Sequence, residues 1–183
     1  IREGKSTYLV LGASGATGLA VAEMLSARES NLLLAARDPA KLEAATGHLD
    51  AERAVVDVCD PRQIEQAFCT AQEAFGAIFG VVNCAGSLLL KPAHLTSDEQ
   101  WSQTIDVNLR GAFNCVRAAG KHMRGTGGSV VLFSSAAAHL GLANHEAIAA
   151  AKAGVEGLVR SAAATYGPKG LRFNAVAPGL VRS

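Results

Sequence analysis

Close to its first residue, the chain reads Tyr8-Leu9-Val10-Leu11-Gly12-Ala13-Ser14-Gly15-Ala16-Thr17-Gly18. A short apolar run, closely spaced glycines and an alanine-rich segment, in this order, predict a strand, a tight turn and a helix. Gly12 can adopt backbone angles that other residues avoid, Gly15 lets a bound group approach the main chain, and Gly18 lets helix and strand pack closely. The free N–H groups at the start of such a helix bind phosphates, although small residues in a turn also serve packing alone.

Further apolar runs follow the first one and alternate with segments that are long enough for helices. These runs begin at residues 31, 54, 80 and 129. Strands that alternate with helices form a parallel sheet whose two faces are both covered by helices. The chain has no repeat, low-complexity tract or linker, so the sequence predicts one α/β domain over residues 1–183.

The second half of the chain carries polar residues at a distinctive spacing. Ser135, Ile148 and Lys152 are separated by twelve and then three residues. Two segments precede them, Gly80-Val81-Val82-Asn83-Cys84-Ala85-Gly86 and Asp106-Val107-Asn108-Leu109. Together with the glycine-rich turn, these motifs resemble the short-chain dehydrogenase/reductase family over essentially the whole chain. The family carries Tyr where this chain has Ile148, and a second Asn where it has Cys84.

This resemblance implies a Rossmann-type doubly wound parallel sheet with strand order 3-2-1-4-5-6 and helices on both faces. Most relatives continue past the position of Ser183 with a substrate loop, a helix and a seventh strand. We therefore expect a C-terminal substrate lobe that is short or absent, either because the protein is shortened or because the sequence is part of a longer chain.

The resemblance also implies the roles of the catalytic residues. Ser135 would hold the substrate carbonyl, Lys152 would bind the nicotinamide ribose and lower the pKa of the phenol, and Asn108 would distort its helix to hold a water beside the lysine. As an alternative, Asn108 is a polar residue that only kinks the helix. Ile148 can neither give nor take a proton, and the loss of a general acid costs about 10²–10⁴ in rate.

Two groups can replace the missing acid. His145 comes three residues before Ile148, so a continuous helix would place both side chains on one face. A histidine can act as an acid near neutral pH, but a His-Glu pair at a helix start is also typical of capping and solvated charge. A water held by Lys152, next to Ser135, is the other candidate.

The resemblance places a dinucleotide along the carboxyl ends of the strands. Its binding residues would be Gly12, Ser14, Gly15, Ala16, Thr17, Gly18, Arg37, Asp57, Val58, Asn83, Ala85, Gly86, Lys152, Pro178 and Gly179. Relatives selective for NAD carry an acid at the position of Ala36, whereas this chain has Arg37 one residue later. A guanidinium forms paired contacts with a 2′-phosphate, and Ser14 can add a hydroxyl, so we expect NADP (NADPH) rather than NAD. The alternatives are that Arg37 is a solvated charge and Asp57 a turn former.

The composition limits the partners and the location. A net charge of +1 without a basic run argues against nucleic acid. No apolar stretch reaches membrane-spanning length and no secretory signal opens the chain, so we expect no membrane partner and a cytoplasmic protein. Cys59, Cys69, Cys84 and Cys115 lack the close pairs of a zinc site, so we expect free thiols and no metal.

The helices around Asn108 and Lys152 pair with a second subunit in the family. Small residues allow helices to approach closely, and this chain has them at Ala147, Ala150, Ala151 and Gly154. We therefore expect a homodimer or homotetramer.

Two functions from different classes remain after this reading. The first is an oxidoreductase that transfers hydride between NADP(H) and a small-molecule carbonyl or alcohol, at a reduced rate without Tyr. The presence of Asn108, Ser135 and Lys152 favours it. The alternative is a catalytically inactive NADP(H)-binding sensor or scaffold, in which Lys152 is kept for ribose binding alone.

Overall fold

The fold is described for residues 4–180 of the chain, from a computed structural model. Six parallel strands form one sheet in the order β3-β2-β1-β4-β5-β6. The strands are β1 (Thr7–Leu11), β2 (Asn31–Ala36), β3 (Glu52–Val55), β4 (Ile78–Asn83), β5 (Gly128–Phe133) and β6 (Leu171–Val176). This order confirms the predicted doubly wound Rossmann-type sheet.

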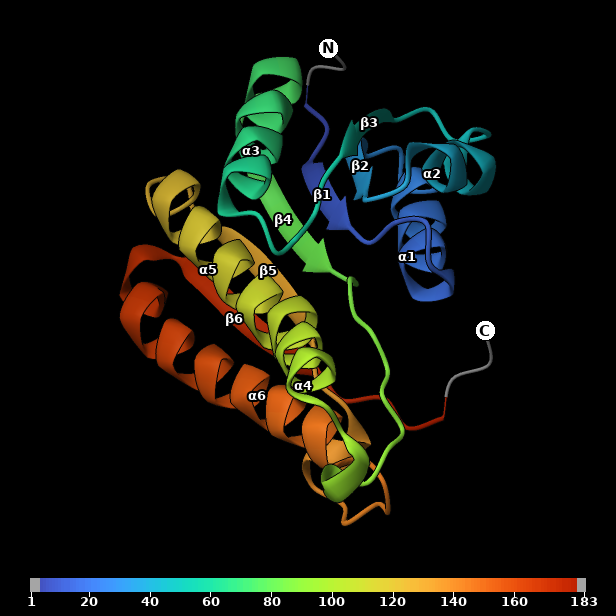
Figure 1. The fold of residues 1–183 in the computed structure, drawn as a ribbon. Coiled ribbons are helices and arrows are strands. Elements are labelled where there is room, and N and C mark those ends of the chain that lie inside the picture. Colours follow the sequence, from blue (N-terminus) through green and yellow to red (C-terminus); the bar gives the residue numbers. More distant parts are fainter. Residues whose placement is uncertain (1–3, 181–183) are drawn as a thin grey trace.

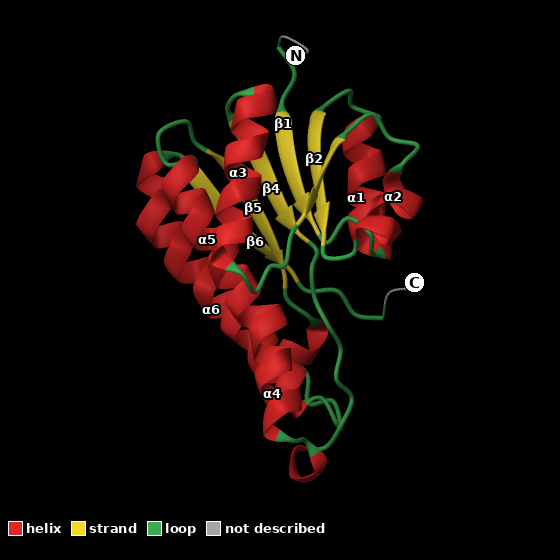
Figure 2. Ribbon diagram, turned by 45° about the horizontal axis from the view of Figure 1, so that its top comes forward, coloured by secondary structure: helices red, strands yellow, loops and turns green. Residues whose placement is uncertain are grey.

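Helices cover both faces of the sheet (Figure 1). They are α1 (Ala16–Ser26), α2 (Pro39–Thr46), α3 (Pro61–Phe75), α4 (Asp98–Ile105), α5 (Gly111–His122) and α6 (Glu146–Tyr166). A π-helical segment, η2 (Asp106–Arg110), joins α4 to α5, and short 3₁₀ turns lie at Ala93–Leu95 (η1), Ala136–Ala138 (η3) and Gly167–Lys169 (η4). Figure 2 shows α1 and α2 on one side of the strands and α3, α5 and α6 on the other.

Each face of the sheet has its own hydrophobic core. On one face, buried side chains of β2 and β1 pack with Ala22 of α1 and Leu42 of α2. On the other face, α3 contributes Ile64, Ala67, Phe68 and Ala71, whose spacing places them on one side of that helix. The central β2 is buried along its whole length, as expected for a strand covered on both faces.

Local sequence signals fix where several helices begin. Asp38 and Asp60 cap α2 and α3 through backbone N–H groups of Lys41 and Arg62, and a proline follows each cap. Ser97 and Gln100 form a capping box at the start of α4. These caps define where the helices begin. The loops before them lie at the carboxyl ends of the strands, where the candidate site is found.

The described chain continues from β6 only to Leu180, and residues 177–180 form neither helix nor strand. Residues 181–183 lie outside the described residues. In residues 4–180, no helix combines the length and the apolar character that crossing a membrane would require.

Candidate active site

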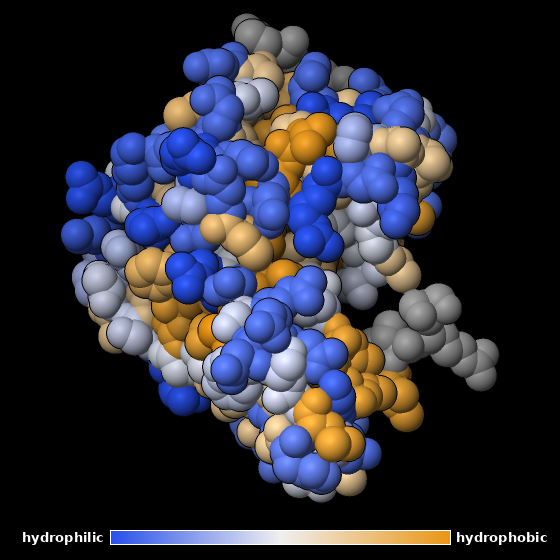
Figure 3. All heavy atoms as spheres, viewed as in Figure 1, coloured by the Kyte–Doolittle hydropathy of each residue, from blue (hydrophilic) through white to orange (hydrophobic). Residues whose placement is uncertain are grey.

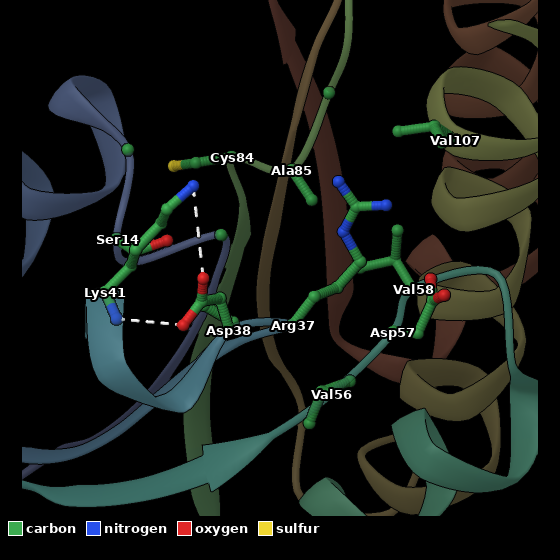
Figure 4. A pocket seen from close by; sticks show the side chains of 14 residues that line it. Ser14, Arg37, Asp38, Lys41, Val56, Asp57, Val58, Cys84, Ala85 and Val107 are labelled. Carbon is green, nitrogen blue, oxygen red and sulfur yellow. Dashed lines mark hydrogen bonds and ion pairs between the residues drawn. The ribbon is translucent and has the colours of Figure 1, made fainter. Parts of the chain in front are cut away.

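A cavity of about 250 Å³ opens at the carboxyl ends of the strands on the two sides of β1. Figure 4 shows side chains from the glycine turn, the end of β2, the segment after β3 and the segment after β4 around it. The predicted cofactor residues that line it are Gly12, Ser14, Gly15, Arg37, Asp57, Val58, Ala85 and Gly86. Residues not proposed as cofactor ligands complete the wall: Ala36, Asp38, Lys41, Val56, Cys84 and Val107. The other predicted cofactor residues lie outside this wall.

The glycine turn has almost no room for side chains at two of its positions. Gly12 has φ +77°, and a methyl group there would lie 2.6 Å from the backbone nitrogen of Ala85. A methyl group at Gly18 would lie 2.2 Å from the carbonyl oxygen of Gly12. At Gly15, which caps α1 and lines the cavity, the nearest atom would be 3.6 Å away. Gly12 and Gly18 therefore hold the turn together, and Gly15 leaves space at the helix start.

The start of α1 has the properties of a phosphate site. Gly15 offers no side-chain cap, so the first N–H groups of the helix, at Ala16, Thr17 and Gly18, have no cap partner. Such N–H groups carry partial positive charge and bind anions. Because the helix start adjoins the cavity, the residues present fit the pyrophosphate of a dinucleotide.

Charged residues gather where β2 ends. Arg37, Asp38 and Lys41 all line the cavity. Arg37 is exposed, and its guanidinium points away from the other two, towards Ala85 and Val58 (Figure 4). The Asp38 carboxylate accepts a hydrogen bond of 3.0 Å from the backbone N–H of Lys41, and its other oxygen lies 3.9 Å from the Lys41 ammonium. Asp38 is therefore engaged as a helix cap, whereas the Arg37 guanidinium remains next to the cavity. The sequence reading missed Lys41, although its place four residues after Arg37, in the first turn of a helix, was a usable signal.

Asp57, in the segment after β3, forms a turn and also lines the cavity. The carboxylate of Asp57 accepts a hydrogen bond of 2.9 Å from the N–H of Cys59, which makes it a turn former. Asp57 and the buried Val58 also line the cavity. Val58 in turn packs so closely on Gly111 that a methyl group on that glycine would lie 2.8 Å from a Val58 methyl.

Hydrogen bonds donated by backbone N–H groups hold the loop after β4 in place. The N–H of Cys84 donates to the carbonyl of Leu11 at 2.8 Å, and the buried side chain of Asn83 accepts from the N–H of Ala85 at 3.1 Å. The thiol of Cys84 is not needed for these bonds. Burial raises its pKa to about 12, so it stays protonated at neutral pH.

Asn108 lies at the centre of the π-helical segment. Its Nδ2 donates to the carbonyl of Thr104 at 3.0 Å, the oxygen that a regular α-helix uses for the backbone N–H of residue 108. Asn108 also holds Ser87, accepting from its N–H at 3.2 Å and donating to its hydroxyl at 3.0 Å. This distortion of the helix is the one that the sequence reading expected of Asn108.

Lys152 reaches the same place from α6. A methyl group on Gly86 would lie 3.1 Å from Asn108 Oδ1 and 3.7 Å from Lys152 Nζ, so both side chains converge on this glycine. Lys152 donates a hydrogen bond of 2.8 Å to the carbonyl of Phe133. Burial lowers the pKa of Lys152 to about 8. The ammonium can therefore lose or give a proton near neutral pH.

The two serines after β5 have different surroundings. Ser135 is partly exposed, and its hydroxyl accepts a hydrogen bond of 3.2 Å from the N–H of Ala137. Ser134 is buried, and its hydroxyl lies 2.6 Å from Glu156 and 3.2 Å from the carbonyl of Lys152. The hydrogen bond from Ser134 lowers the pKa of Glu156. Ser134 thus fixes α6, and Ser135 is the serine at the open edge of the sheet.

Ile148 lies one helical turn before Lys152 and is 3 % exposed. The premise of a helix continuous through His145 is wrong, because α6 begins at Glu146 and His145 has φ −110° and ψ 12°. His145 Nδ1 lies 2.7 Å from the carbonyl of Ala143 in the preceding loop. Tyr8 packs on Phe79, and Tyr166 packs on Phe173 of β6.

The residues after β6 return towards Ser135. The carbonyl of Pro178 accepts a hydrogen bond of 2.9 Å from the N–H of Ala136, the residue after Ser135. Pro178 and Gly179 are thus held beside the end of β5, although neither lines the cavity.

The helix face expected to meet a second subunit is used within the chain. Ala147 and Ala151 are buried, and a methyl group on Gly154 would lie 2.9 Å from Leu109. Only Ala150 of that set is exposed. The proposed role of this face was therefore wrong, because it packs on the η2 segment and α4.

Comparisons with known proteins agree on one kind of relative. Residues 12–183 match the family described as "Enoyl-(Acyl carrier protein) reductase". The chain is 36% identical to the short-chain reductase protein NovJ of Streptomyces niveus, covering 97% of this chain and 70% of that protein. It is 32% identical to a D-threitol dehydrogenase of Mycolicibacterium smegmatis, covering 94% and 69%. The solved structure of a short-chain type dehydrogenase/reductase from Mycobacterium ulcerans superposes with a TM-score of 0.91 at 30% identity, covering 97% and 68%.

Proposed function

Because this chain belongs to the short-chain dehydrogenase/reductase family, whose members bind nicotinamide cofactors, we propose that it is an oxidoreductase acting on a carbonyl or alcohol with NADP(H). The nicotinamide would supply or accept hydride. The observation that carries the proposal is the convergence of Asn108 and Lys152 on Gly86, at the edge of the cavity. A pocket that bound a nucleotide without chemistry would not require both groups there.

The charges at the end of β2 support NADP over NAD. Arg37 and Lys41 both line the cavity, and a guanidinium can contact a 2′-phosphate through paired hydrogen bonds. An acid that binds both ribose hydroxyls would favour NAD, but Asp38 is held as the cap of α2. Arg37 is therefore the main candidate residue to bind the 2′-phosphate.

Proton transfer would fall to Lys152, directly or through a water that it holds. Its lowered pKa matches the working pH of a general acid. Ser135, at the open edge of the sheet, would hold the carbonyl oxygen of the substrate. Ile148 adds no proton donor, so we expect a rate about 10²–10⁴ below that of a site with Tyr at this position.

Exposed leucines suggest an apolar substrate. Leu88 and Leu90 follow the cavity wall, and Leu140 and Leu142 precede α6; all are at least 45% exposed. The two loops meet where the N–H of Lys91 donates to the carbonyl of Asn144 at 2.8 Å. Figure 3 shows hydrophobic surface around this end of the molecule. Such a rim fits a carbonyl or alcohol compound with an apolar body better than a charged sugar.

A second candidate function rests on Ile148. A buried hydrocarbon at the position of the acid suits a protein that binds NADP(H) and signals or scaffolds without turnover. In either case we propose a homodimer or homotetramer. Trp101 on α4 and Phe113 on α5, which are 45% and 48% exposed, would contribute to the contact in place of the alanine face.

The test has two stages on the natural protein. Calorimetric titration with NADPH and with NADH should show micromolar binding with a preference for NADPH. Steady-state assays with a panel of apolar aldehydes, ketones and alcohols should then show slow turnover. Tight NADPH binding without turnover of any of these substrates would favour the sensor or scaffold over the oxidoreductase. No binding of either nucleotide would contradict both functions.

A further inference from the structure

Three side chains able to bind a metal lie together where α3 and α5 adjoin. Glu65 and Cys69 are four residues apart on α3, so they share one side of that helix. His122 is the last residue of α5, which lies beside α3 (Figure 1). One ligand atom from each residue lies within 4.8 Å of the other two. The cluster thus joins a carboxylate, a thiol and an imidazole from two helices.

The histidine ring is held in a fixed orientation. Nδ1 lies 2.8 Å from Gln72 Oε1, an oxygen that can only accept, so Nδ1 donates to it. Phe68 packs on the ring with the two centroids 5.5 Å apart. Nε2 therefore faces the cluster, 2.7 Å from Glu65 Oε1. Histidines that bind metals usually donate their other N–H to such an acceptor, which fixes the tautomer.

The spacing of the ligand atoms suits a tetrahedral ion. Zinc binds nitrogen and oxygen at about 2.0–2.2 Å and sulfur at about 2.3 Å, so its ligand atoms lie about 3.3–3.8 Å apart. The contact between His122 and Glu65 would have to widen by about 0.6 Å, and the exposed end of the Glu65 side chain permits this. Lys121, which also contacts Glu65, is 67% exposed and can move aside.

The cluster is reachable from solvent and separate from the cavity. Glu65 and His122 are 33% and 11% exposed, and Cys69 is half-buried. None of the three lines the cavity. His122 lies eleven residues after Gly111, which packs on the cavity residue Val58, a distance of about 16 Å along the helix.

We propose that Glu65, Cys69 and His122 form a binding site for a divalent transition metal of the zinc type, with a fourth position left for water. Thiolate and imidazole together select such ions over Mg²⁺ and Ca²⁺, which prefer oxygen ligands. Binding displaces the proton of the Cys69 thiol, because the thiolate is the form that ligates the metal. The ion would join α3 to α5, so it would stabilise the helical layer over this face of the sheet rather than take part in the chemistry at the cavity.

The test uses cobalt(II), whose complexes with thiolates absorb in the near ultraviolet. A chelator first removes metal from the untagged chain. The chain is then titrated with cobalt(II) in a buffer that contains a phosphine reductant. We expect one equivalent of cobalt to bind with a thiolate charge-transfer band, and zinc to displace it. Cys69→Ser should abolish the band, and Gln72→Leu, which releases the ring of His122, should weaken binding about 10- to 100-fold.

Matched controls separate this site from other thiols and histidines. Cys59→Ser and His48→Gln, which alter residues outside the cluster, should leave the cobalt titration unchanged. Circular dichroism verifies that each variant is folded, and Glu65→Gln replaces Cys69→Ser if the latter is not. Absence of the band in the natural protein at millimolar cobalt would overturn the proposal, as would a band that survives Cys69→Ser. A melting temperature that zinc raises in the natural protein, but not in folded Cys69→Ser or Glu65→Gln, would support it.

Discussion

The Nζ atom of Lys152 lies 2.8 Å from the carbonyl oxygen of Phe133, the last residue of β5. This bond ties the middle of α6 to the edge of the sheet and holds the ammonium beside Gly86. Because the amine is buried there, its pKa falls from 10.5 to about 8. The protonation of one side chain is thereby linked to the folding of the domain.

Lys152→Met should remove a pH dependence of stability. Between the folded pKa of about 8 and the unfolded value of 10.5, the unfolded chain holds a proton on Lys152 that the folded chain has released. The free energy of unfolding therefore rises with pH in this window, by roughly 3 kcal/mol in total. Urea unfolding of both proteins at about pH 7 and about pH 10 measures it.

The comparison with Lys152→Met cancels the other titrating groups. The buried thiols Cys84 and Cys115 have raised pKa values and act in the opposite direction, but equally in both proteins. As the pH rises, the free energy of unfolding of the natural protein should increase relative to that of Lys152→Met. An unchanged difference between the two would mean that Lys152 titrates as a solvated lysine.

Ile148→Tyr should raise the turnover of a carbonyl substrate by about 10²-fold or more, because it places a phenol one helical turn from Lys152. The matched control is Ile148→Phe, which adds the ring without the hydroxyl. Both variants enlarge a buried side chain and should lose about 1–3 kcal/mol of stability. Steady-state rates decide the matter, and equal rates for the two variants would show that the hydroxyl has no catalytic effect.

Arg37→Ala should weaken the binding of NADPH about 10- to 100-fold, the value of a lost charge-assisted hydrogen bond. NADH lacks the 2′-phosphate, so its affinity should stay the same. Lys41→Ala should act in the same direction but less, because the Lys41 ammonium is 78% exposed and already near Asp38. Calorimetry of the natural protein and both variants with each nucleotide gives the dissociation constants to compare. Equal losses for NADPH and NADH would place Arg37 elsewhere than at the 2′-phosphate.

Gly18→Ala should destabilise the domain by about 1–3 kcal/mol, because the new methyl group would meet the Gly12 carbonyl at 2.2 Å and backbone atoms must move. Gly15→Ala is the control, since its methyl group has 3.6 Å to the nearest atom. It should cost less than about 1 kcal/mol while narrowing the cavity and weakening nucleotide binding. Urea unfolding with a nucleotide titration separates the two effects, and similar losses of stability would contradict this account of the turn.

The sheet could be predicted because its signals are local. The apolar run of β2, the glycines at Gly12 and Gly18, and the caps at Asp38 and Asp60 each act on neighbouring residues. Crossovers between parallel strands are almost always right-handed, which limits the possible strand orders in the sheet. The family resemblance then indicated the order 3-2-1-4-5-6. The helix distortion at Asn108 was expected from the family resemblance, and the structure shows that its contact with Thr104, four residues earlier, is local.

Contacts between distant segments could not be predicted in the same way. The sequence places Ala147 and Ala151 on a helix face, but only the packing of α6 shows that this face is buried against η2 and α4. In the same way, the spacing of Glu65 and Cys69 places both on one side of a helix, but His122 joins them only because α5 packs beside α3.

The sequence by itself determined the α/β sheet, the glycine turn and the presence of Ser135, Asn108 and Lys152 with Ile at position 148. Periodicity and backbone sterics are properties of adjacent residues, so they can be read along the chain. Tertiary structure alone decided that Lys152 loses water and so has a lowered pKa, and that Asp38 caps a helix while Arg37 lines the cavity. Burial and proximity arise only when distant segments pack, because each depends on what the rest of the chain excludes from water.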